Sequence, residues 1–333
     1  MMRLIVPQKI EFLSHSIQET DDTDGSEWSA STAYAKDARV RYEHISYTSL
    51  AANNKGNDPS KTWSGDDAKW KKVDATMPYR MCDEYVETQT RAKTGEHLSF
   101  CVKFDRADAF ALFNLDGYDL RAHVYDLESD TPDEPVWPDE WDFWQDLSKI
   151  SLWEYIYNPI VSAWTLVEDI SAYSLYEYNY APIVGRNRCY FSGIPIQIKG
   201  KLCIDIDPGD SSLTAALGQI VIGRMFEIGW TEYDAELGFT DFSRKTTDEF
   251  GRTTLVRRSS SNTMSLPIYL HPDQGDYVKQ VLDSARGIPC AWIGSNFDND
   301  YRALTLYGAL EDYRLVYAGP NEMRLSLEIQ GLI

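Results

Sequence analysis

Basic residues are scarce in this chain. Its 32 Lys and Arg face 52 Asp and Glu, so the net charge at pH 7 is −20. Binding to nucleic acid or to an anionic membrane needs clustered cations, and this balance excludes a general affinity for either. The deficit is uneven, because residues 1–235 hold 22 basic and 39 acidic residues (−17) while residues 236–333 hold 10 and 13 (−3).

Long apolar runs are absent as well. The apolar opening around Leu4 is broken by Lys9 and Glu11, far short of the roughly 20 apolar residues of a spanning helix. It also lacks the apolar core of a signal peptide. We expect a first β-strand here and no insertion into a membrane.

Cysteines are few and scattered, with no CxxC pair among Cys82, Cys101, Cys189, Cys203 and Cys290. An odd, widely spaced set predicts reduced thiols in the core rather than a disulfide framework or a zinc site. This pattern favours synthesis in a reducing cytoplasm. Catalytic signatures such as GxSxG, HExxH, the P-loop and GxGxxG are also missing. We therefore predict that the protein is not an enzyme and needs no cofactor.

Aromatic residues are abundant, with 21 Tyr, 12 Phe and 10 Trp. Their rigid, amphipathic surfaces suit sheets, protein interfaces and sugar-stacking sites alike. Short apolar runs alternate with turns in a spacing that predicts an all-β sandwich. These runs are residues 97–104, 110–115, 121–127, 193–207 and 219–229.

Four further segments carry local signals. Residues 40–42 and 45–49, joined by Glu43 and His44, predict a hairpin. Residues 126–146 hold nine acidic residues and no basic one, which predicts an exposed excursion, and the spacing of Trp137, Trp141 and Trp144 allows a helical stripe there. A helix capped by Asp273 is expected, with a buried face formed by Tyr277, Val278, Val281, Leu282 and Ala285. Alternation from Met323 to Ile329 predicts a half-buried strand.

The sequence DIDPGD places Asp205, Asp207 and Asp210 close together. Several carboxylate oxygens in one loop suit calcium. The alternative is a strand that ends in a Pro-Gly turn with solvated acids, and the missing EF-hand register favours it.

The order Trp28, Tyr34, Val40, Tyr42, Tyr47, Pro59 and Trp63 resembles the small carbohydrate-binding modules of chitinases. The resemblance implies a carbohydrate-binding face formed by Trp28, Tyr34, Tyr42, Tyr47 and Trp63. The family's adjacent exposed tryptophans correspond here to residues 51–54, Ala-Ala-Asn-Asn. Two alternatives follow, a working sugar site or a retained fold that does not bind chitin.

Residues 78–90, 110–124, 200–207 and 219–229 resemble a galactose-binding-like, discoidin-type jelly roll of phage tail proteins. Tyr79 and Arg80 stand at the entry motif, and Ile222, Gly223 and Arg224 at the closing motif. Such proteins carry the aromatic module between the opening strand and the jelly roll. Residues from about 265 onward resemble the β domain with one helix that distal-tail and baseplate proteins use to form rings. The basic residues Arg252, Arg257 and Arg258 are candidates for assembly against an acidic face such as residues 126–146.

The predicted fold is mainly β, a jelly-roll β-sandwich with a small inserted aromatic β module and a C-terminal β domain carrying one helix. The expected segments are the jelly roll's opening strand and loop (1–25), the inserted carbohydrate-binding-like module (26–75), the jelly roll (76–235) and the C-terminal assembly domain (236–333). The resemblance implies a structural phage tail component in the virion, synthesised in the host cytoplasm. Its expected partners are other tail or baseplate proteins, further copies in a homo-oligomeric ring, and host surface glycan.

Two other interpretations remain open. One is a secreted or cell-surface polysaccharide-binding or polysaccharide-cleaving protein. The other is a calcium-dependent adhesin that uses Asp205, Asp207 and Asp210.

Overall fold

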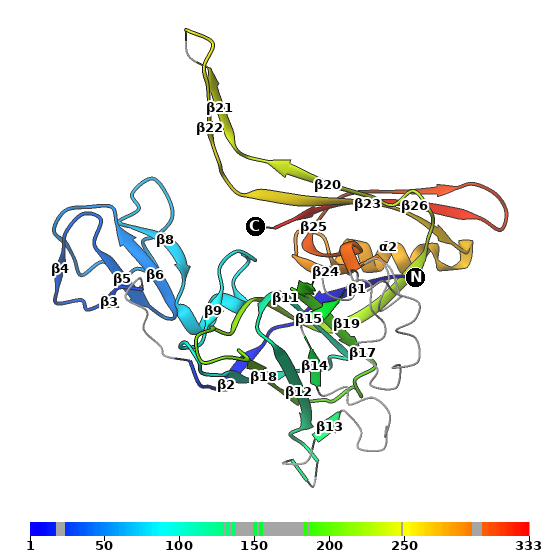
Figure 1. Ribbon diagram of the computed structural model, residues 1–333, viewed down its shortest axis with the longest axis horizontal. Coiled ribbons are helices and arrows are strands. Elements are labelled where there is room, and N and C mark those ends of the chain that lie inside the picture. The colour runs from blue at the N-terminus through cyan, green and yellow to red at the C-terminus, as the bar shows by residue number, and fades with distance from the viewer. Residues whose placement is uncertain are drawn as a thin grey trace, which may run out of the picture.

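A computed structural model of the chain describes residues 1–17, 24–129, 131–132, 135–137, 149–151, 153–155, 183–185, 187–247, 249–294 and 302–332. The fold is mainly β, with antiparallel sheets and one α-helix near the C-terminus, as the sequence predicts (Figure 1). No helix in this described part is long and apolar enough to cross a membrane.

Two large sheets pack face to face as a sandwich. The larger sheet has the strand order β17-β11-β19-β1-β24-β25-β26-β23-β20, with β9 paired to β19. Its strands are β1 (Met2–Pro7), β9 (Thr90–Arg91), β11 (Ala109–Asp116), β17 (Arg188–Ser192), β19 (Ala216–Thr231), β20 (Glu236–Asp241), β23 (Ser260–Leu270), β24 (Cys290–Ile293), β25 (Thr305–Tyr317) and β26 (Met323–Gly331).

The smaller sheet has the order β13-β12-β18-β10-β2, with β14 paired to β12. Its strands are β2 (Glu11–His15), β10 (Leu98–Phe104), β12 (Asp119–Asp126), β13 (Pro135–Trp137), β14 (Lys149–Ser151) and β18 (Gly200–Asp207). Strand β18 alternates strictly between buried and half-buried residues, so Leu202, Ile204 and Ile206 enter the core. They pack with Phe110 and Leu112 of the larger sheet.

Half of the larger sheet closes on itself. The last residues of β19 pair with β23, Trp230 opposite Tyr269, so the path β19-β1-β24-β25-β26-β23 returns to its start. One sheet therefore contains strands from both sides of residue 236, where the sequence suggested a domain boundary. The residue limits of the four predicted segments remain predictions. Gly223 lies where β1 meets β19, and a Cβ there would be 1.8 Å from the carbonyl oxygen of Val6.

A helix covers this closed half. The 3₁₀ turn η3 (Pro272–Gln274) leads into α2 (Gly275–Ser284), and η4 (Arg302–Leu304) precedes β25. Val278, Val281 and Leu282 are buried against β23 and β26. Tyr277, expected on the same face, is 48% exposed. Asp273 does not cap α2, because the chain enters through η3, where His271 Nδ1 accepts the Asp273 N–H.

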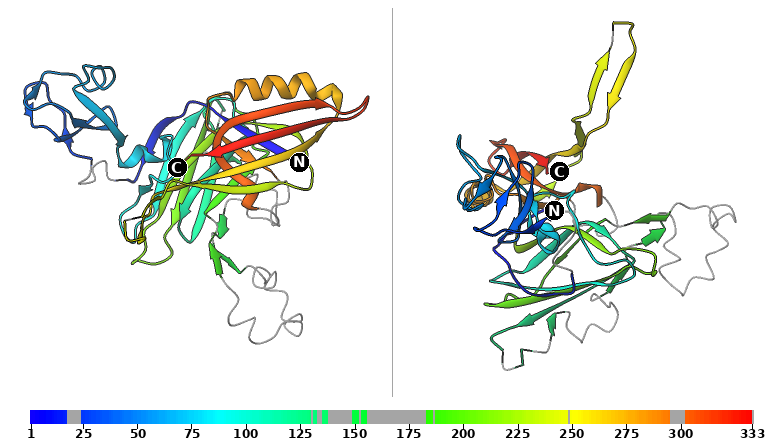
Figure 2. Two further views of the ribbon diagram at one scale, coloured as in Figure 1. Left: turned by 90° about the horizontal axis from the view of Figure 1, so that it is seen from above. Right: turned by 90° about the vertical axis from the view of Figure 1, so that its left-hand side faces the viewer.

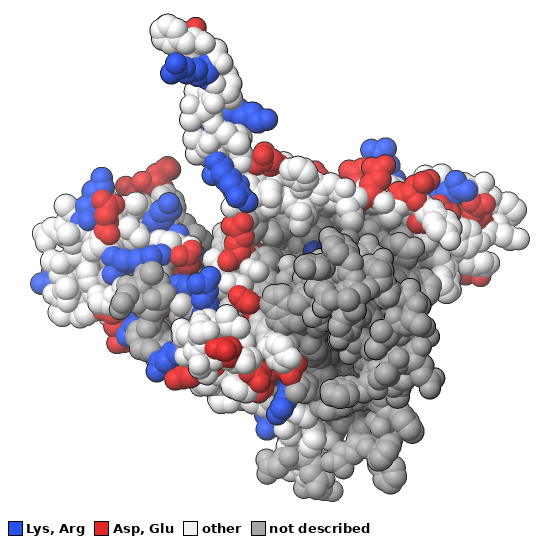
Figure 3. Space-filling view, in the orientation of Figure 1, with Lys and Arg blue, Asp and Glu red and all other residues white. Residues whose placement is uncertain are grey.

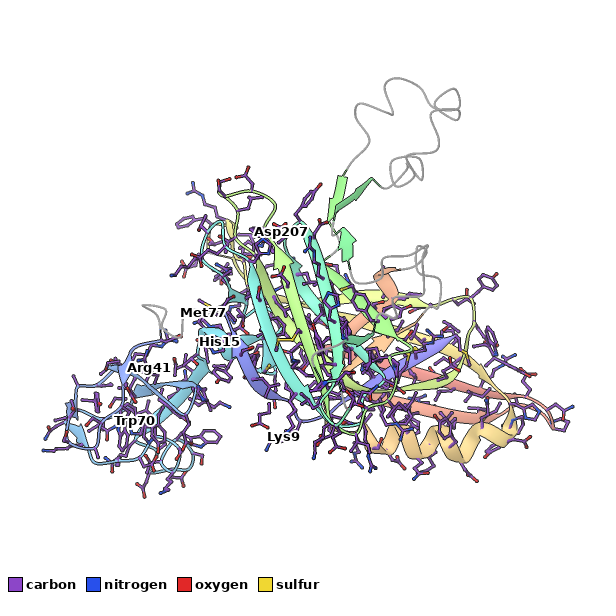
Figure 4. All side chains as sticks on the ribbon, turned by 90° about the horizontal axis from the view of Figure 1, so that it is seen from below. Lys9, His15, Arg41, Trp70, Met77 and Asp207 are labelled. Atoms are coloured by element: carbon purple, nitrogen blue, oxygen red, sulfur yellow. A yellow bond between two sulfur atoms is a disulfide. The ribbon has the colours of Figure 1, made fainter. Side chains whose placement is uncertain are left out.

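A small unit lies beside the sandwich. Its four-stranded sheet is formed by β3 (Ser26–Glu27), β5 (Arg39–Tyr42), β6 (Ile45–Ser49) and β8 (Trp70–Ala75), and β4 (Ala33–Tyr34) pairs with β7 (Asn54–Lys55). The predicted hairpin is confirmed, because Tyr42 pairs with Ile45 and the two turn residues between them have positive φ angles. The 3₁₀ helix η1 (Met77–Cys82) leads back to the sandwich (Figure 4).

Two further pairs stand apart, β15 (Trp153–Tyr155) with β16 (Ile183–Gly185), and β21 (Arg244–Thr247) with β22 (Thr253–Val256). Trp137 lies in strand β13 rather than in a helix. Trp141 and Trp144 lie outside the described residues, as does most of the acidic segment 126–146.

The prediction of uniformly reduced cysteines is wrong. Cys101 of β10 and Cys203 of β18 form a disulfide, while Cys82, Cys189 and Cys290 form none. The two residues face each other in the antiparallel register of neighbouring strands. A separation of 102 residues along the chain hides this pairing from sequence analysis.

Candidate protein-interaction site

Residues 236–260 form a β-arm that stands out from the body of the protein (Figure 2). Strand β20 pairs with β23 at the base, and the hairpin of β21 and β22 continues the arm outward. Every residue of β20, β21 and β22 is exposed. An isolated two-stranded hairpin is only marginally stable in water. The hairpin of β21 and β22 therefore receives little stabilisation from the rest of the chain, whereas β20 is held by its pairing with β23.

The arm exposes an unusual number of large apolar side chains. Phe250 near the tip is 89% exposed and Phe239 on β20 is 70% exposed. The others with large exposed fractions are Leu237, Phe242, Leu255 and Val256. Exposed apolar groups concentrated on one projection are typical of a surface that another molecule covers.

The arm also differs in charge from the rest of the chain. Residues 244–258 contain five basic side chains and two acidic ones, within a protein of net charge −20. The basic residues are Arg244, Lys245, Arg252, Arg257 and Arg258. Figure 3 shows Lys and Arg side chains along the arm and many acidic side chains on the body. The arm is thus suited to an acidic partner surface.

A hollow of about 690 Å³ lies at the base of the arm, between β20 and β22 and the loop at Glu87. Arg257 and Arg258 line it together with Phe239 and Asp241. Hydrogen bonds from the Ser243 hydroxyl and backbone N–H hold the pKa of Asp241 below its usual range. The hollow therefore brings together the carboxylate of Asp241, the guanidinium groups of Arg257 and Arg258, and the exposed ring of Phe239.

The structure separates the three arginines that the sequence grouped for assembly. Arg257 and Arg258 lie at the base, whereas Arg252 lies near the tip, beside Phe250 and Gly251 and just before β22. The Arg258 N–H donates to Ser243 Oγ at 3.0 Å, and Ser259 Oγ donates to Glu87 Oε2 at 2.9 Å. Sequence analysis identified the charges but missed the exposed apolar side chains around them. The sequence signal that could have indicated these apolar side chains was the alternation of Leu237 and Phe239 in a segment that ends in polar residues.

The five aromatic residues predicted to bind carbohydrate do not form one outward face. Tyr34 and Tyr47 are buried in the small unit's own core with Val40 and Trp70. Trp28 and Tyr42 are half-buried and pack edge to face, with ring centroids 5.2 Å apart. Trp63 is 45% exposed, and Lys72 Nζ lies 5.9 Å from its ring centroid. Only Trp63 of these five offers a largely open ring.

The three aspartates of the predicted metal site are engaged by neighbouring protein groups, and His97 lies between two of them, with Nδ1 3.0 Å from Asp205 and Nε2 3.8 Å from Asp207. Asp207 Oδ1 accepts the Gly209 N–H at 2.7 Å, and Asp210 Oδ1 accepts the Ser212 N–H at 2.8 Å. Asp205 accepts a hydrogen bond from Ser99 and lies 3.0 Å from His97 Nδ1. Among the described residues, no group of three or more His, Cys, Asp or Glu side chains is arranged to hold a metal ion.

Ser99, His97 and Asp205 are the three residue types of a Ser-His-Asp catalytic triad and contact one another through Asp205. The carboxylate of Asp205 lies in the middle and contacts both other side chains. A nucleophilic triad needs the histidine in the middle, where it accepts the serine proton. Here the Asp205 carboxylate, and not the histidine, accepts the Ser99 hydroxyl, so the order of the three side chains differs from that of the triad.

A comparison with protein-family models found no match, and neither did a comparison with curated proteins.

Proposed function

We propose that this protein is a structural component of a phage tail, at the distal tail or baseplate, and that the β-arm packs on a second copy of the chain in a homo-oligomeric ring. The observation that carries the proposal is the arm itself, which projects six exposed apolar side chains and an excess of positive charge. The sequence resemblance to tail proteins supplies the biological setting.

The occupant of the arm is argued from charge. Residues 1–235 carry 22 basic and 39 acidic residues, so a second copy presents the acidic surface that the arm complements. Strand β20 also forms an edge of the ten-stranded sheet. An edge strand with free backbone groups readily pairs with a strand from another chain. Apolar burial supplies most of the affinity, because each exposed ion pair contributes only about 0–1 kcal/mol.

Sedimentation velocity of the full chain tests this proposal. The wild type is expected to form a discrete oligomer at micromolar concentration, and a triple variant with Phe239→Ser, Phe250→Ser and Leu255→Ser is expected to be monomeric. A matched control carries Ile196→Ser and Ile198→Ser, which replace equally exposed apolar residues on the sandwich. A cooperative thermal unfolding transition in each protein establishes that all three are folded, with the dissociated variant expected to melt somewhat lower because association stabilises the folded state.

Negative-stain images of the wild-type oligomer then show whether it is a closed ring, as a tail component requires. A wild-type chain that remains monomeric, or a control variant that dissociates as fully as the arm variant, would contradict the proposal.

A further inference from the structure

A cavity of about 230 Å³ lies where the sandwich meets the closed half of the larger sheet. Its walls include Phe113 of β11, Arg188 of β17, and Thr305 and Tyr307 of β25. It is separate from the aromatic residues, aspartates and arginines that the sequence singled out. Arg188 and Thr305, which meet here, are 117 positions apart along the chain, so only the fold creates the cavity.

Arg188 is the only basic side chain among the residues that line this cavity. Its Nη1 donates to the carbonyl oxygen of Thr305, and its Nε lies 3.4 Å from Asn187 Oδ1. Both acceptors are neutral. Within the described ranges, no carboxylate forms an ion pair with this guanidinium. Burial lowers the pKa of Arg188, because the charged form has lost part of its hydration.

A guanidinium has five N–H donors, and at least three remain available here. A partly desolvated charge without a counter-charge destabilises the protein unless an anion reaches it. The cavity provides space for such an anion. A carboxylate matches the planar fork of the guanidinium with two parallel hydrogen bonds.

The remaining walls select the kind of anion. Val86, Phe113, Leu306 and Leu332 contribute the apolar part of the lining, and Asn114, Ser260 and Asn262 contribute uncharged polar groups. Such walls favour a ligand with a hydrocarbon portion over the fully hydrated phosphate or sulfate ion. Glu87 also lies in the lining, and its negative charge repels a multiply charged anion more strongly than a singly charged one. Tyr307 adds a neutral hydroxyl, because burial raises its pKa and keeps it protonated.

We propose that this cavity is a binding site for a small monocarboxylate with a short apolar tail, and that Arg188 binds its carboxylate group. The inference does not depend on oligomerisation, since all the residues named belong to one chain. It assigns a ligand-binding role to a protein in which we predict no catalysis.

Sodium butyrate is a suitable probe, with sodium chloride at equal ionic strength as the reference. Saturation-transfer NMR is expected to detect butyrate binding in the millimolar range, and the melting temperature is expected to rise with butyrate concentration. Arg188→Gln should weaken binding by about tenfold or more, because hydrogen bonds to a charged group are lost. Arg188→Lys, which keeps the charge without the fork, should give an intermediate affinity.

Arg314→Gln is the matched control, because Arg314 lies on the same strand as Tyr307 but is exposed and paired with Asp312 at 3.5 Å. It should bind butyrate like the wild type. Without butyrate, Arg188→Gln should melt at the wild-type temperature or above, since it removes an uncompensated charge. No butyrate binding by the wild type, sulfate binding as tight as butyrate binding, or a large loss of stability in Arg188→Gln with unchanged butyrate affinity would overturn the proposal.

Discussion

The guanidinium of Arg80 lies 3.0 Å from the carboxylate of Asp24, whose side chain is 1% exposed. The other carboxylate oxygen of Asp24 accepts the Met77 N–H at 3.0 Å, and its backbone carbonyl accepts the Ser46 hydroxyl at 3.1 Å. Ser46 belongs to the small unit, whereas Met77 and Arg80 belong to η1. Asp24 therefore ties the small unit to the segment that leads into the sandwich.

Removing Asp24 should destabilise this junction strongly. Asp24→Ala removes the buried carboxylate that pairs with Arg80 and accepts the Met77 N–H, and we expect a loss of about 3–5 kcal/mol in the free energy of unfolding. Chemical denaturation measures this loss, and limited proteolysis shows whether cleavage falls near residues 76–80. Asp74→Ala is the control, because the Arg39–Asp74 pair is about one-third exposed on each side and contributes at most about 1 kcal/mol. Equal losses in the two variants would contradict this account.

The disulfide between Cys101 and Cys203 should stabilise the smaller sheet. It closes a loop of 102 residues, and a cross-link of this kind typically contributes about 2–4 kcal/mol by restricting the unfolded chain. The double variant Cys101→Ser with Cys203→Ser should lose that amount in urea denaturation. Wild type treated with a reductant should then unfold like the variant. A reductant that leaves the wild-type transition unchanged while mass spectrometry shows free thiols would refute the prediction.

Asp83 should make stability fall as pH rises between about 4 and about 6. Burial raises the pKa of Asp83 to about 6, against hydrogen bonds from the Thr88 hydroxyl and the Tyr85 N–H that lower it. The folded state therefore binds a proton more tightly than the unfolded state, whose carboxyl has a pKa near 3.9. The stability advantage of the protonated carboxyl is complete below the unfolded pKa and is lost as pH passes the folded pKa.

Asp83→Asn isolates this effect. The variant should be more stable than wild type at pH 7, and the difference should shrink toward pH 4. Denaturation curves at five pH values between 3.5 and 7.5 measure it. A difference that is constant across this range would show that Asp83 does not titrate as described.

Trp70 should be the main core residue of the small unit. It is fully buried, its ring packs on Tyr34 with centroids 5.5 Å apart, and its Nε1–H donates to the Asn57 carbonyl at 2.9 Å. Trp70→Ala should destabilise the unit by about 3–5 kcal/mol, whereas Trp63→Ala should have an effect below about 1 kcal/mol because that ring is largely open. Proteolysis rates within residues 26–75 provide the readout. Similar rates for both variants would contradict this assignment.

Periodic signals in the sequence predicted much of the fold. Met323, Leu325, Leu327 and Ile329 alternate with polar residues and are buried as expected in β26. The hairpin around Glu43 and most of the buried face of α2 also followed from local pattern. These features depend on neighbouring residues, whose side chains repeat every two or 3.6 positions. Tyr277 was misassigned because helical periodicity does not say how wide the covered face is.

The candidate sites were harder to predict. The sequence identified Arg252, Arg257 and Arg258 as a local basic group but gave no indication that this part of the chain projects as an arm. Asp205, Asp207 and Asp210 were close in sequence, yet their carboxylates are engaged by His97, by Ser99 and by N–H groups of the following turns. The predicted carbohydrate-binding face does not include Tyr34 and Tyr47, which are buried in the core of the small unit. The sequence alone does not distinguish an aromatic residue that packs in such a core from one that lies on its surface.

The sequence by itself determined the β class, the amphipathic strands, the helix near the C-terminus and the uneven charge of this protein, because each depends on composition or on residues close together in the chain. Tertiary structure alone decided the Cys101–Cys203 bond, the Asp24–Arg80 pair, the closure of β19 on β23 and the cavity at Arg188. Each of these joins residues dozens of positions apart through strand register and packing, and no local pattern specifies which distant strands become neighbours.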